Sequence, residues 1–542
     1  MDMADKVFLN GQIITVDASN RLAEAVAVKG NRIVAVGRND EVKQWIGPVT
    51  RVFDLRGKSL VPGFIDAHLH MSIYGTNKLG VNAKDSNITS ISDLLAELKR
   101  KSEMTPKGEW VRAWGFDENR VKEKRFPTRE ELDSVSTIHP IFVMRTCAHR
   151  SIVNSLALQR AGFDEHTPDP PGGRIERDGE GKLTGLLVET AHMQMFEVAG
   201  FSEKELLQGL KLASDDFLAA GITSIHDAGG YGPDNLRAMQ KAVQDGLVKV
   251  RIYAMVCALN QSEEFVKKMV DAGIVTGLGD EHFRIGPAKV FTDGASSSAT
   301  MALREPYTSK PEDYGILYYS QEELNRILIE AHAKGFQITA HAQGDRAIEM
   351  LLNCFETALT KFPRNNHRHR IEHAGVSMPD LVERMAKLGI VPIPNPAFFI
   401  EFGDGYLKDI GERVEHMYPV RDFFDRGIIA AGGSDAPVTA YNPLLGIHGA
   451  VNRCSNSGQV VGAKQRISVM EAIRMFTWNG AYASFEEHLK GSIEVGKLAD
   501  LVILSDRILD IPTDAIKDLV VEMTILDGEI VYKKSNKDVL EL

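Results

Sequence analysis

The sequence predicts an α/β protein built around a distorted (β/α)₈ (TIM) barrel, with a small β-sandwich domain formed by both termini. Three observations support this prediction. The middle of the 542-residue chain alternates short apolar segments with amphipathic helical stretches, whereas both ends are rich in β-type sequence. The stretch after the first predicted barrel strand is much longer than one strand–helix crossover needs, which predicts an inserted subdomain.

The two ends of the chain are expected to form hairpins. AVAVKGNRIVAVG turns at Gly30, and VEMTILDGEIVYK turns at Asp527-Gly528. Glycine, and aspartate followed by glycine, favour the tight turns that join antiparallel strands. We therefore predict one composite β-sandwich domain from residues 1–60 and 486–542. Two separate terminal hairpins that lie on the barrel are the alternative.

The middle of the chain, residues 61–485, is predicted to form the barrel. Amphipathic stretches such as 322–335 and 379–389 end at a glycine and separate most of the apolar segments. A doubly wound open sheet is less favoured, because no GxGxxG pattern opens a helix. The eight predicted strands are 63–70, 222–228, 250–256, 283–291, 336–342, 369–374, 389–396 and 427–435.

The inserted subdomain is assigned to residues 71–220. It contains a helical stretch at 91–103 and strand-like stretches at 140–146 and 183–189. Because the insertion follows the first barrel strand, we expect it near the active site, over the C-terminal face of the barrel. There it would shape the access of substrate.

Charge and composition argue against nucleic-acid binding and are typical of a soluble globular protein. The formal net charge is −11, from 63 basic and 74 acidic residues, which argues against a nucleic-acid binder. Hydrophobic residues make up 43% and charged residues 25% of the chain, as in ordinary soluble globular proteins. The expected partner is a small-molecule substrate. A homodimer is the commonest default for the oligomeric state, which the sequence leaves open.

Cysteine usage and the N-terminal sequence favour a cytoplasmic protein with no membrane association. The cysteines are scattered and form no CxxC pair, which fits a reducing compartment. The N-terminal segment carries acidic residues and no apolar core of a signal peptide. No run of ~18 apolar residues suggests a membrane span. The four cysteines are Cys147, Cys257, Cys354 and Cys454.

A histidine pair ends the first predicted barrel strand. Asp66, His68 and His70 are two residues apart, so their side chains face one side of the strand. The two imidazoles can therefore hold one metal ion. Alone this pattern is weak, but barrel enzymes keep their active sites at the C-terminal ends of the strands.

Three later strand ends carry the same kind of residue. His341 closes FQITAHA, His373 closes RIEHA, and Asp435 closes IIAAGGSDA. Because parallel barrel strands end at one rim, we expect these side chains to converge with the histidine pair. Imidazole and carboxylate ligands suit zinc, and also Mn, Fe, Co or Ni. Without cysteine in the set, a catalytic site is more consistent than a closed structural site.

Longer stretches of the chain also follow a family pattern. FIDAHLH, the single histidines of two later strands, and GGSDAP resemble the amidohydrolase superfamily. The chain most closely resembles the YtcJ-like branch, the relatives of N-substituted formamide deformylase. This resemblance covers nearly the whole chain, and its motifs are much less specific for substrate than for family. The further stretches are WGFDE (114–118), CAHRSIVNSLAL (147–158), GGRIERDGEGKLTGLLVE (172–189), GPAKVFTDGASSSATMA (286–302), HAQGDRAI (341–348) and GSIEVGKLADLVILS (491–505).

The resemblance implies a binuclear metal centre, with two zinc ions as the first choice. In such proteins a lysine of the fourth strand is carboxylated by CO₂, and Lys289 in GPAKVF stands at the matching place. Without the resemblance, a structural lysine that reaches a surface carboxylate would be favoured. The implied ligands are His68, His70, Asp435 and the Lys289 carbamate for one metal, and the carbamate, His341 and His373 for the other.

The implied reaction is hydrolysis of an amide-type C–N bond, in an N-acyl or N-formyl amine. A metal-bridging hydroxide would attack the carbonyl, and Asp435 would accept its proton and pass it to the leaving amine. Further candidates for substrate contact are weaker. They are His226, for which a supporting or packing role is an equal alternative, and Trp114, Asp117 and His149 in the insertion.

Three other functions are alternatives to amide hydrolysis. An aminohydrolase (deaminase) is disfavoured, because mononuclear deaminases of the superfamily usually carry a glutamate where this chain has Gly344. A lactonase or esterase stays open, since the same hydroxide attacks esters. A metal-free scaffold or binding protein is hard to reconcile with a complete set of ligands.

Overall fold

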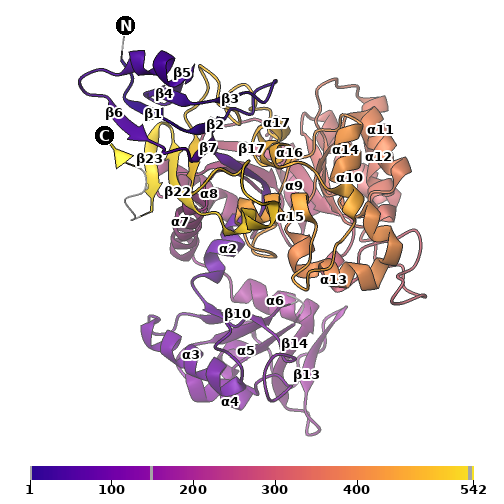
Figure 1. Cartoon of the computed structure of the whole chain (residues 1–542). Coiled ribbons are helices and arrows are strands. Elements are labelled where there is room, and N and C mark those ends of the chain that lie inside the picture. The colour runs from indigo at the N-terminus through magenta and orange to yellow at the C-terminus, as the bar shows by residue number, and fades with distance from the viewer. Residues whose placement is uncertain (1–2, 147–149, 535–539) are drawn as a thin grey trace. The chain divides into compact units, whose positions relative to one another are not determined.

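The computed structural model describes residues 3–146, 150–534 and 540–542 (Figure 1). The chain forms two compact units. One unit combines Met1–Met71 with Ala213–Leu542, and the other is Ser72–Leu212. Each unit is described in turn.

The first unit contains a parallel barrel sheet of seven strands, which confirms the predicted fold class. Consecutive strands pair with one another, and the buried strands read as near-continuous apolar runs, as expected for parallel strands covered on both faces. The strands are β8 (Phe64–Leu69), β15 (Ile222–Asp227), β16 (Arg251–Val256), β17 (Phe283–Phe291), β18 (Ile338–Ala342), β19 (Arg370–His373) and β20 (Val391–Ile393).

The eighth predicted strand, residues 427–435, is not a regular strand. It runs between the first and last strands and bonds to both: Ala431 N–H donates to Pro392 O (3.1 Å), and Ala67 N–H donates to Gly432 O (2.9 Å). These scattered bonds do not build a continuous ladder. A Cβ on Gly432 would lie 2.5 Å from a neighbouring aromatic ring, so only glycine allows this close passage.

Amphipathic helices accompany the barrel, and Figure 1 shows α10, α11 and α12 side by side. The predicted helices at 322–335 and 379–389 are α10 and α12. Ser320 caps α10, and Gly389 ends α12 with a left-handed φ of 68°. The helices are α8 (Pro233–Gln244), α9 (Ser262–Asp271), α10 (Gln321–Ala333), α11 (Asp345–Lys361), α12 (Pro379–Leu388), α13 (Phe398–Ile410), α14 (Val420–Asp425), α15 (Pro443–Asn452), α16 (Val469–Met475) and α17 (Trp478–Ala483), with short 3₁₀ turns η2 (Ser296–Ser298), η3 (Gly411–His416) and η4 (Ala463–Gln465).

Strands from both chain ends form two further sheets that share one apolar core, as the predicted β-sandwich requires. Phe8 and Val26 of one sheet pack with Leu60 and Ile503 of the other. One sheet has the order β24-β6-β1-β4-β5, and the other β23-β22-β21-β7-β2-β3. The strands are β1 (Lys6–Leu9), β2 (Gln12–Ile14), β3 (Leu22–Ala23), β4 (Ala25–Lys29), β5 (Arg32–Gly37), β6 (Arg51–Asp54), β7 (Ser59–Pro62), β21 (Leu501–Leu504), β22 (Val521–Leu526), β23 (Glu529–Lys533) and β24 (Leu540–Glu541), with short helical turns α1 (Asn39–Val42), η1 (Lys43–Trp45) and η5 (Thr513–Asp518).

Both predicted hairpin turns are present. Gly30, with a φ of 53°, joins the antiparallel strands β4 and β5. Asp527 and Gly528, with φ of 52° and 73°, join β22 and β23. Two successive residues with positive φ suit the right-handed twist of the flanking strands, which explains the Asp-Gly sequence.

The second unit is a sheet covered by helices on both faces. Alternate residues of β11 face opposite ways: Ile141 and Val143 pack with the helices α3 and α4, while Phe142 packs with α5 and α6. The sheet order is β13-β14-β12-β11-β10-β9. The elements are β9 (Val81–Asn82), β10 (Val111–Phe116), β11 (Ile141–Arg145), β12 (Arg150–Val153), β13 (Gly173–Arg177), β14 (Leu183–Glu189), α3 (Ile91–Met104), α4 (Arg129–Val135), α5 (Ser155–Ala161) and α6 (Thr190–Val198), with α2 (Met71–Asn77) and α7 (Glu203–Ala219) as the connecting helices.

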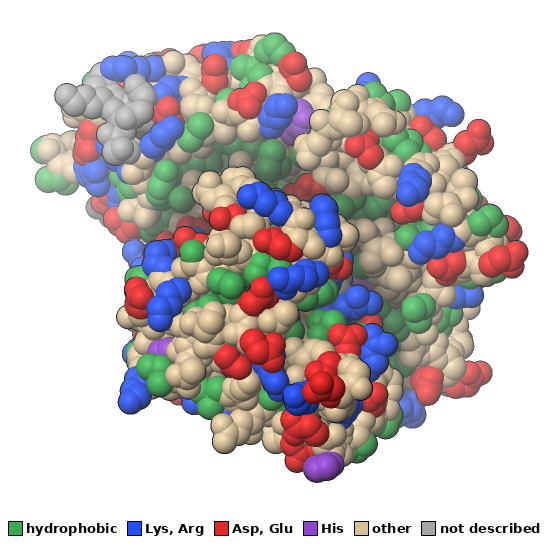
Figure 2. Space-filling view, turned by 90° about the horizontal axis from the view of Figure 1, so that it is seen from below, with side chains coloured by type: hydrophobic (Ala, Val, Ile, Leu, Met, Phe, Trp, Pro, Cys, Tyr) green, Lys and Arg blue, Asp and Glu red, His purple; other side chains and the backbone are tan. Residues whose placement is uncertain are grey.

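The surface mixes charges of both signs. Figure 2 shows acidic and basic side chains interspersed over the face in view, as the composition suggests. Within the part of the chain that the structure describes, no helix combines the length and apolar character that crossing a bilayer demands.

A buried ion pair joins the barrel to the terminal sheets. Arg251, which begins β16, donates from Nε and Nη2 to the carboxylate of Asp500 at 2.8 and 3.1 Å, and the two side chains are 1% and 4% exposed. Asp500→Asn should lower the free energy of unfolding by about 3 kcal/mol, because it leaves a buried guanidinium under-compensated. Urea denaturation measures this loss.

The control for that measurement is an exposed pair. Asp40→Asn removes one acidic partner of Arg38, which also pairs with Glu41, and the side chains of Arg38 and Asp40 are both more than half exposed. We expect a change below about 0.5 kcal/mol there. A loss under about 1 kcal/mol in Asp500→Asn would show that the Arg251 pair contributes no more than a surface contact.

Three buried histidines form a network next to the first residues of β18 and β19. His369 Nε2 donates to His332 Nδ1 (2.9 Å), His332 Nε2 donates to Phe362 O (2.7 Å), and His367 Nε2 donates to Leu388 O (2.8 Å). The network therefore uses neutral imidazoles. Burial lowers the pKa of all three histidines, and that of His369 lies well below its usual range.

This network should make the protein sensitive to acid. Below pH ~6.5 the histidines bind protons in the unfolded chain but stay neutral in the folded chain. The free energy of unfolding is therefore highest above that pH and falls as the pH is lowered further. Each histidine contributes a slope of up to ~1.4 kcal/mol per pH unit. In urea denaturation between pH 7 and 5, His369→Gln should flatten the dependence, whereas the core variant Leu328→Val should lower stability without altering the slope. Equal slopes in both variants would contradict the prediction.

Candidate metal centre

Side chains that can bind a metal gather at the C-terminal ends of the barrel strands. His68 lies in β8 and His70 directly follows this strand. Lys289 lies in β17, His341 in β18, and His373 is the last residue of β19. Because the strands are parallel and neighbouring, their ends meet at one rim.

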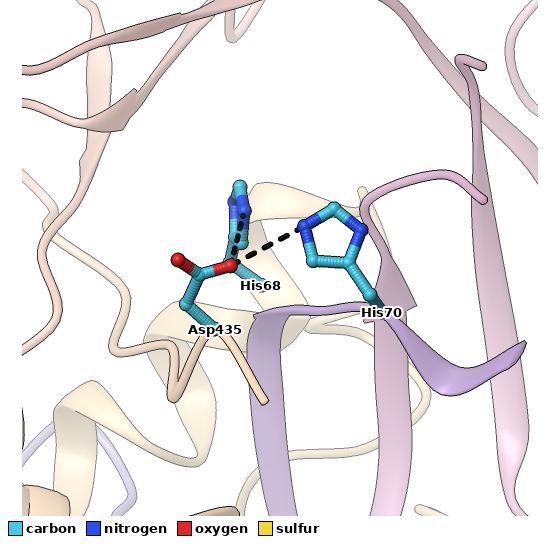
Figure 3. Close-up of side chains that lie close together, drawn as sticks. All are labelled: His68, His70 and Asp435. Atoms are coloured by element: carbon cyan, nitrogen blue, oxygen red, sulfur yellow. Dashed lines mark ion pairs between the residues drawn. The ribbon is translucent and has the colours of Figure 1, made fainter. Parts of the chain in front are cut away.

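The side chains of His68, His70 and Asp435 lie close together, as Figure 3 shows. Nε2 of His68 and Nε2 of His70 lie 3.4 and 3.3 Å from Oδ1 of Asp435. One ligand atom from each residue lies within 4.8 Å of the others. Nε2 of His68 is buried and has no hydrogen-bond partner among the described atoms. A divalent metal fits this donor set, because it would satisfy the orphaned nitrogen with ligands that zinc and its neighbours prefer.

Backbone conformation and hydrogen bonds orient Asp435 toward the two histidines. Asp435 has a left-handed φ of 58°, and its N–H donates to His68 O (2.7 Å). Oδ1 of Asp66 accepts the N–H groups of His68 (3.1 Å) and Ser434 (3.0 Å). Asp66 therefore ties the strand of the histidine pair to the segment that carries Asp435. Burial raises the pKa of Asp66 to about 6.

Hydrogen bonds select which imidazole nitrogen is left to bind a metal. Nδ1 of His70 donates to Gly229 O (2.7 Å), which directs its Nε2 lone pair toward Asp435. Nε2 of His341 donates to Gly294 O (3.1 Å), so this histidine offers Nδ1 instead. A neutral imidazole has one donor and one acceptor, so each bond to a carbonyl fixes the tautomer.

His341 and His373 stand beside the first group. Ring centroids of His373 lie 4.7 Å from His68 and 4.5 Å from His341. Nδ1 of His373 donates to Oδ1 of Asn395 (2.7 Å), which leaves Nε2 with a lone pair. His373 has a φ of 71°, and this left-handed backbone interrupts the alternation of the strand. The structure thus brings all four predicted histidine ligands together.

The pKa values of His341, His373 and Asp435 favour the protonation states that bind a cation. Burial lowers the pKa of His341 to about 4 and that of His373 well below its usual range, so both rings are neutral at pH 7. Burial alone would raise the pKa of Asp435, but contact with the nearby imidazoles of His68, His70 and His373, where these carry a proton, holds it well below its usual range. His341 and His373 thus offer neutral imidazoles, and Asp435 offers a carboxylate anion, as metal binding requires.

Lys289 is fully buried without a carboxylate partner. Its Nζ donates to Ala228 O (2.9 Å) and lies 4.9 Å from the centre of the Phe291 ring. Among the described residues, no acidic side chain lies within 4.0 Å of this nitrogen. The predicted alternative, a lysine that reaches a surface carboxylate, is therefore wrong. Burial of an ammonium without a carboxylate in contact is costly, and the charges of Asp227 and Glu372 act on Lys289 only at longer range.

The weaker candidates are placed differently. Trp114 and Asp117 belong to the unit Ser72–Leu212, where Nε1 of Trp114 donates to Asn77 O (2.9 Å). His149 lies outside the described residues. His226 is buried in β15, and its Nδ1 accepts a hydrogen bond from Nη1 of Arg370 (2.8 Å). For His226, this contact favours the supporting role over contact with substrate.

Three residues that contact the candidate ligands were not predicted from the sequence. Asn395 orients His373, and the pair Arg370–Glu372 contacts His68. The sequence pattern could have indicated the Arg370–Glu372 pair, because the two residues are two apart on a predicted strand and so face the same side. Two opposite charges in a predicted core strand indicate a buried ion pair. Asn395 lies near the end of the predicted strand 389–396 without a charged partner to distinguish it, and in the structure it follows β20.

Comparisons with known proteins agree with this geometry. A model of the family described as "Amidohydrolase family" matches residues 51–532. The chain is 32% identical to N-substituted formamide deformylase of Arthrobacter pascens, over 98% of this chain and 99% of that protein. It is also 32% identical to putative amidohydrolase YtcJ of Bacillus subtilis, over 98% and 99%. A crystal structure of an uncharacterized metal-dependent hydrolase from Pyrococcus horikoshii matches 94% of this chain and 99% of that one, with a TM-score of 0.79 and 26% identity.

Proposed function

The chain belongs to the amidohydrolase family, and from this premise we propose that it is a metal-dependent hydrolase of an amide-type C–N bond in an N-acyl or N-formyl amine. The observation that carries the proposal is the meeting of His68, His70 and Asp435 around an orphaned buried nitrogen. The substrate class rests on the similarity to a formamide deformylase over the whole chain.

We propose two metal positions. His68, His70 and Asp435 would hold one ion, and His341 with His373 the other, and a carbamate of Lys289 would supply further oxygen ligands. Addition of CO₂ to the neutral amine of Lys289, with release of one proton, would give a carbamate anion whose two oxygens can bind metal, in place of a buried ammonium. Zinc is the first choice, with Mn, Fe, Co and Ni as alternatives. When bound, such ions lower the pKa of a water molecule and polarise the carbonyl of the substrate.

Asp435 is proposed to move the proton. Its carboxylate is ionised at neutral pH and lies at the centre of the ligand group, so it can accept the proton of the attacking water. The same carboxyl then donates that proton to the departing nitrogen as the C–N bond breaks, so an amine and a carboxylic acid leave. Trp114, Asp117 and His149 remain proposed substrate contacts, and we further propose a cytoplasmic protein that acts on small molecules.

Position 344 argues against the deaminase alternative. The glutamate that mononuclear deaminases carry there has no room in this fold, because a Cβ on Gly344 would lie 1.8 Å from Ala302 O. The N–H of Gly344 instead donates to Asp293 Oδ2 (2.8 Å). The backbone itself occupies the space that a side chain would need.

Metal analysis combined with a substrate screen tests the proposal. Protein produced with zinc and bicarbonate should carry about two metals per chain in elemental mass spectrometry and hydrolyse N-formyl or N-acyl amines. Removal of the metals by a chelator should abolish hydrolysis, and added zinc should restore it. A preparation that takes up no metal, or a metal-loaded protein that cleaves esters but none of these amides, would overturn the proposal.

A matched pair of variants locates the metals. His68→Asn should lose metal, because it removes a ligand with an orphaned nitrogen. His282→Asn is the control, since His282 lies in a half-exposed group with Glu281 and Asp527 that could also attract a cation. Metal lost only in the control would assign the bound ions to that surface group.

A further inference from the structure

A buried ion pair contacts the first metal position from outside the ligand set. Arg370 and Glu372 lie in β19, and both side chains are 0% exposed. Nε and Nη2 of Arg370 donate to Oε1 and Oε2 of Glu372 at 2.8 and 3.0 Å. The charges cancel, so the pair adds no net charge to the core. Its hydrogen-bonding groups are aimed at specific neighbours instead.

The carboxylate of Glu372 is saturated with donors. Besides the two from Arg370, it accepts the hydroxyl of Thr339 (2.8 Å) and Nδ1 of His68 (2.5 Å). The bond to His68 is the shortest imidazole contact of the metal centre. It fixes His68 with its proton on Nδ1 and its lone pair on the orphaned Nε2.

The other three histidine ligands have weaker partners. Their ring N–H groups donate to uncharged oxygens of Gly229, Gly294 and Asn395, at 2.7 to 3.1 Å. A carboxylate also lies near His341, where Asp293 Oδ1 is 3.4 Å from Nε2, but the hydrogen bond of that nitrogen goes to Gly294 O. Among the described ligands, His68 alone donates to a carboxylate. A carboxylate partner raises the basicity of a metal-binding imidazole and fixes its orientation.

Arg370 holds the carboxylate of Glu372 in place through its own contacts with neighbouring strands. Its Nη2 also donates to Ala67 O (2.7 Å) and its Nη1 to Nδ1 of His226 (2.8 Å). Ala67 directly precedes His68 in β8, and His226 lies in the neighbouring strand β15. The guanidinium therefore links three barrel strands around one ligand and leaves Glu372 little freedom to turn.

We propose that Glu372, held by Arg370, is a positioning residue that makes the His68–His70–Asp435 position the tighter of the two metal positions, so that it fills first. His226 takes part as a contact of Arg370. This inference rests on the proposed function, because it presumes a metal at that position. It adds to the proposed function a residue outside the ligand set that contributes to the order of metal loading.

Metal titration of Glu372→Gln tests the inference. Apo protein in bicarbonate buffer is titrated with zinc in competition with a chromophoric chelator, which gives the affinity of each step. The amide keeps an oxygen of similar shape but removes the charge, so the tighter step should weaken by about 10- to 100-fold. Cobalt titration gives a second readout, since its visible spectrum reports the coordination of the first ion. The change in the weaker step should be smaller.

Two further variants separate positioning from general damage. Asp500→Asn breaks another buried ion pair that contacts none of the metal ligands, and it should leave both zinc affinities unchanged. Thr339→Val removes one donor to Glu372 without altering charge, and it should weaken the tighter step about 3-fold. If Glu372→Gln does not fold, Thr339→Val decides the question.

The outcomes are distinct. A weaker first step in Glu372→Gln or Thr339→Val, together with unchanged affinities in Asp500→Asn, supports the inference. Unchanged zinc affinities in the folded Glu372 and Thr339 variants would overturn it and leave the proposed function intact. Equal losses in Asp500→Asn would also overturn it, because the effect would then be general. A wild-type protein that binds no zinc would overturn the proposed function and this inference together.

Discussion

Asp435→Asn is expected to lower kcat/KM for hydrolysis of an N-formyl amine by ~10²–10⁴-fold, the usual contribution of a proton-transfer group. The substitution keeps the shape of the side chain but removes the base that accepts the proton of water. The fold around it should persist, because the N–H of residue 435 and the N–H of Ser434 form the bonds to His68 O and Asp66 Oδ1. Steady-state kinetics with a formamide substrate measure the effect.

The metal content of the same sample must be measured to interpret the kinetics, since Asp435 is also a proposed metal ligand. A variant that keeps its metals and loses activity points to proton transfer, whereas loss of both points to the ligand role. Thr439→Val is the matched control, because Thr439 lies in the same loop and its hydroxyl donates to Ser434 O (2.6 Å). We expect the control to stay within about 5-fold of wild type, the effect of one ordinary hydrogen bond. More than a tenth of wild-type activity in Asp435→Asn would contradict the role of Asp435.

Lys289→Met should remove the proposed carbamate ligand of the metal centre. We expect metal content to fall from about two per chain to one or fewer, and activity to fall by at least about 10²-fold, because metal ions supply several kcal/mol of charge stabilisation. Methionine has a similar length and no charge, so a site that buries the side chain completely should accept it. Elemental mass spectrometry and kinetics on one preparation give both numbers.

The same variant separates a carbamate from a structural lysine. Wild-type protein prepared with ¹³C-bicarbonate should show one carbamate carbon resonance that Lys289→Met lacks. The free energy of unfolding of the metal-free variant should equal or exceed that of metal-free wild type, because a buried ammonium bonded only to Ala228 O is removed. Two metals retained in the variant, together with lower stability, would assign a structural role to Lys289.

The periodicity of the sequence was sufficient for the barrel. Seven predicted segments are strands, and the helices begin and end near the predicted positions, because the amphipathic pattern and the glycine stops act locally. The segment 427–435 was predicted as a strand and is not one. Its apolar run had the right length, but whether a segment forms a ladder depends on hydrogen bonds with β8 and β20, which no local pattern encodes.

The candidate ligands could also be predicted from the sequence. His68, His70, His341, His373 and Asp435 were selected because each stands at the end of a predicted strand, and a closed parallel barrel brings all such ends to one rim. Their convergence follows from topology, so knowing the order of strands and helices was enough. The role of Lys289 was different, since only the resemblance to a family indicated it.

By itself the sequence determined the α/β architecture, the hairpins of both ends and the residue types at the rim, because these depend on periodicity, turn chemistry and chain order. The tertiary structure alone decided which nitrogen each imidazole offers, how Asp435 turns toward the histidines, and that Glu372 supports His68. These features depend on contacts between residues far apart in the chain, such as His68 with Glu372 and His70 with Gly229. They also depend on left-handed backbone at His373 and Asp435, which tertiary contacts impose against local preference.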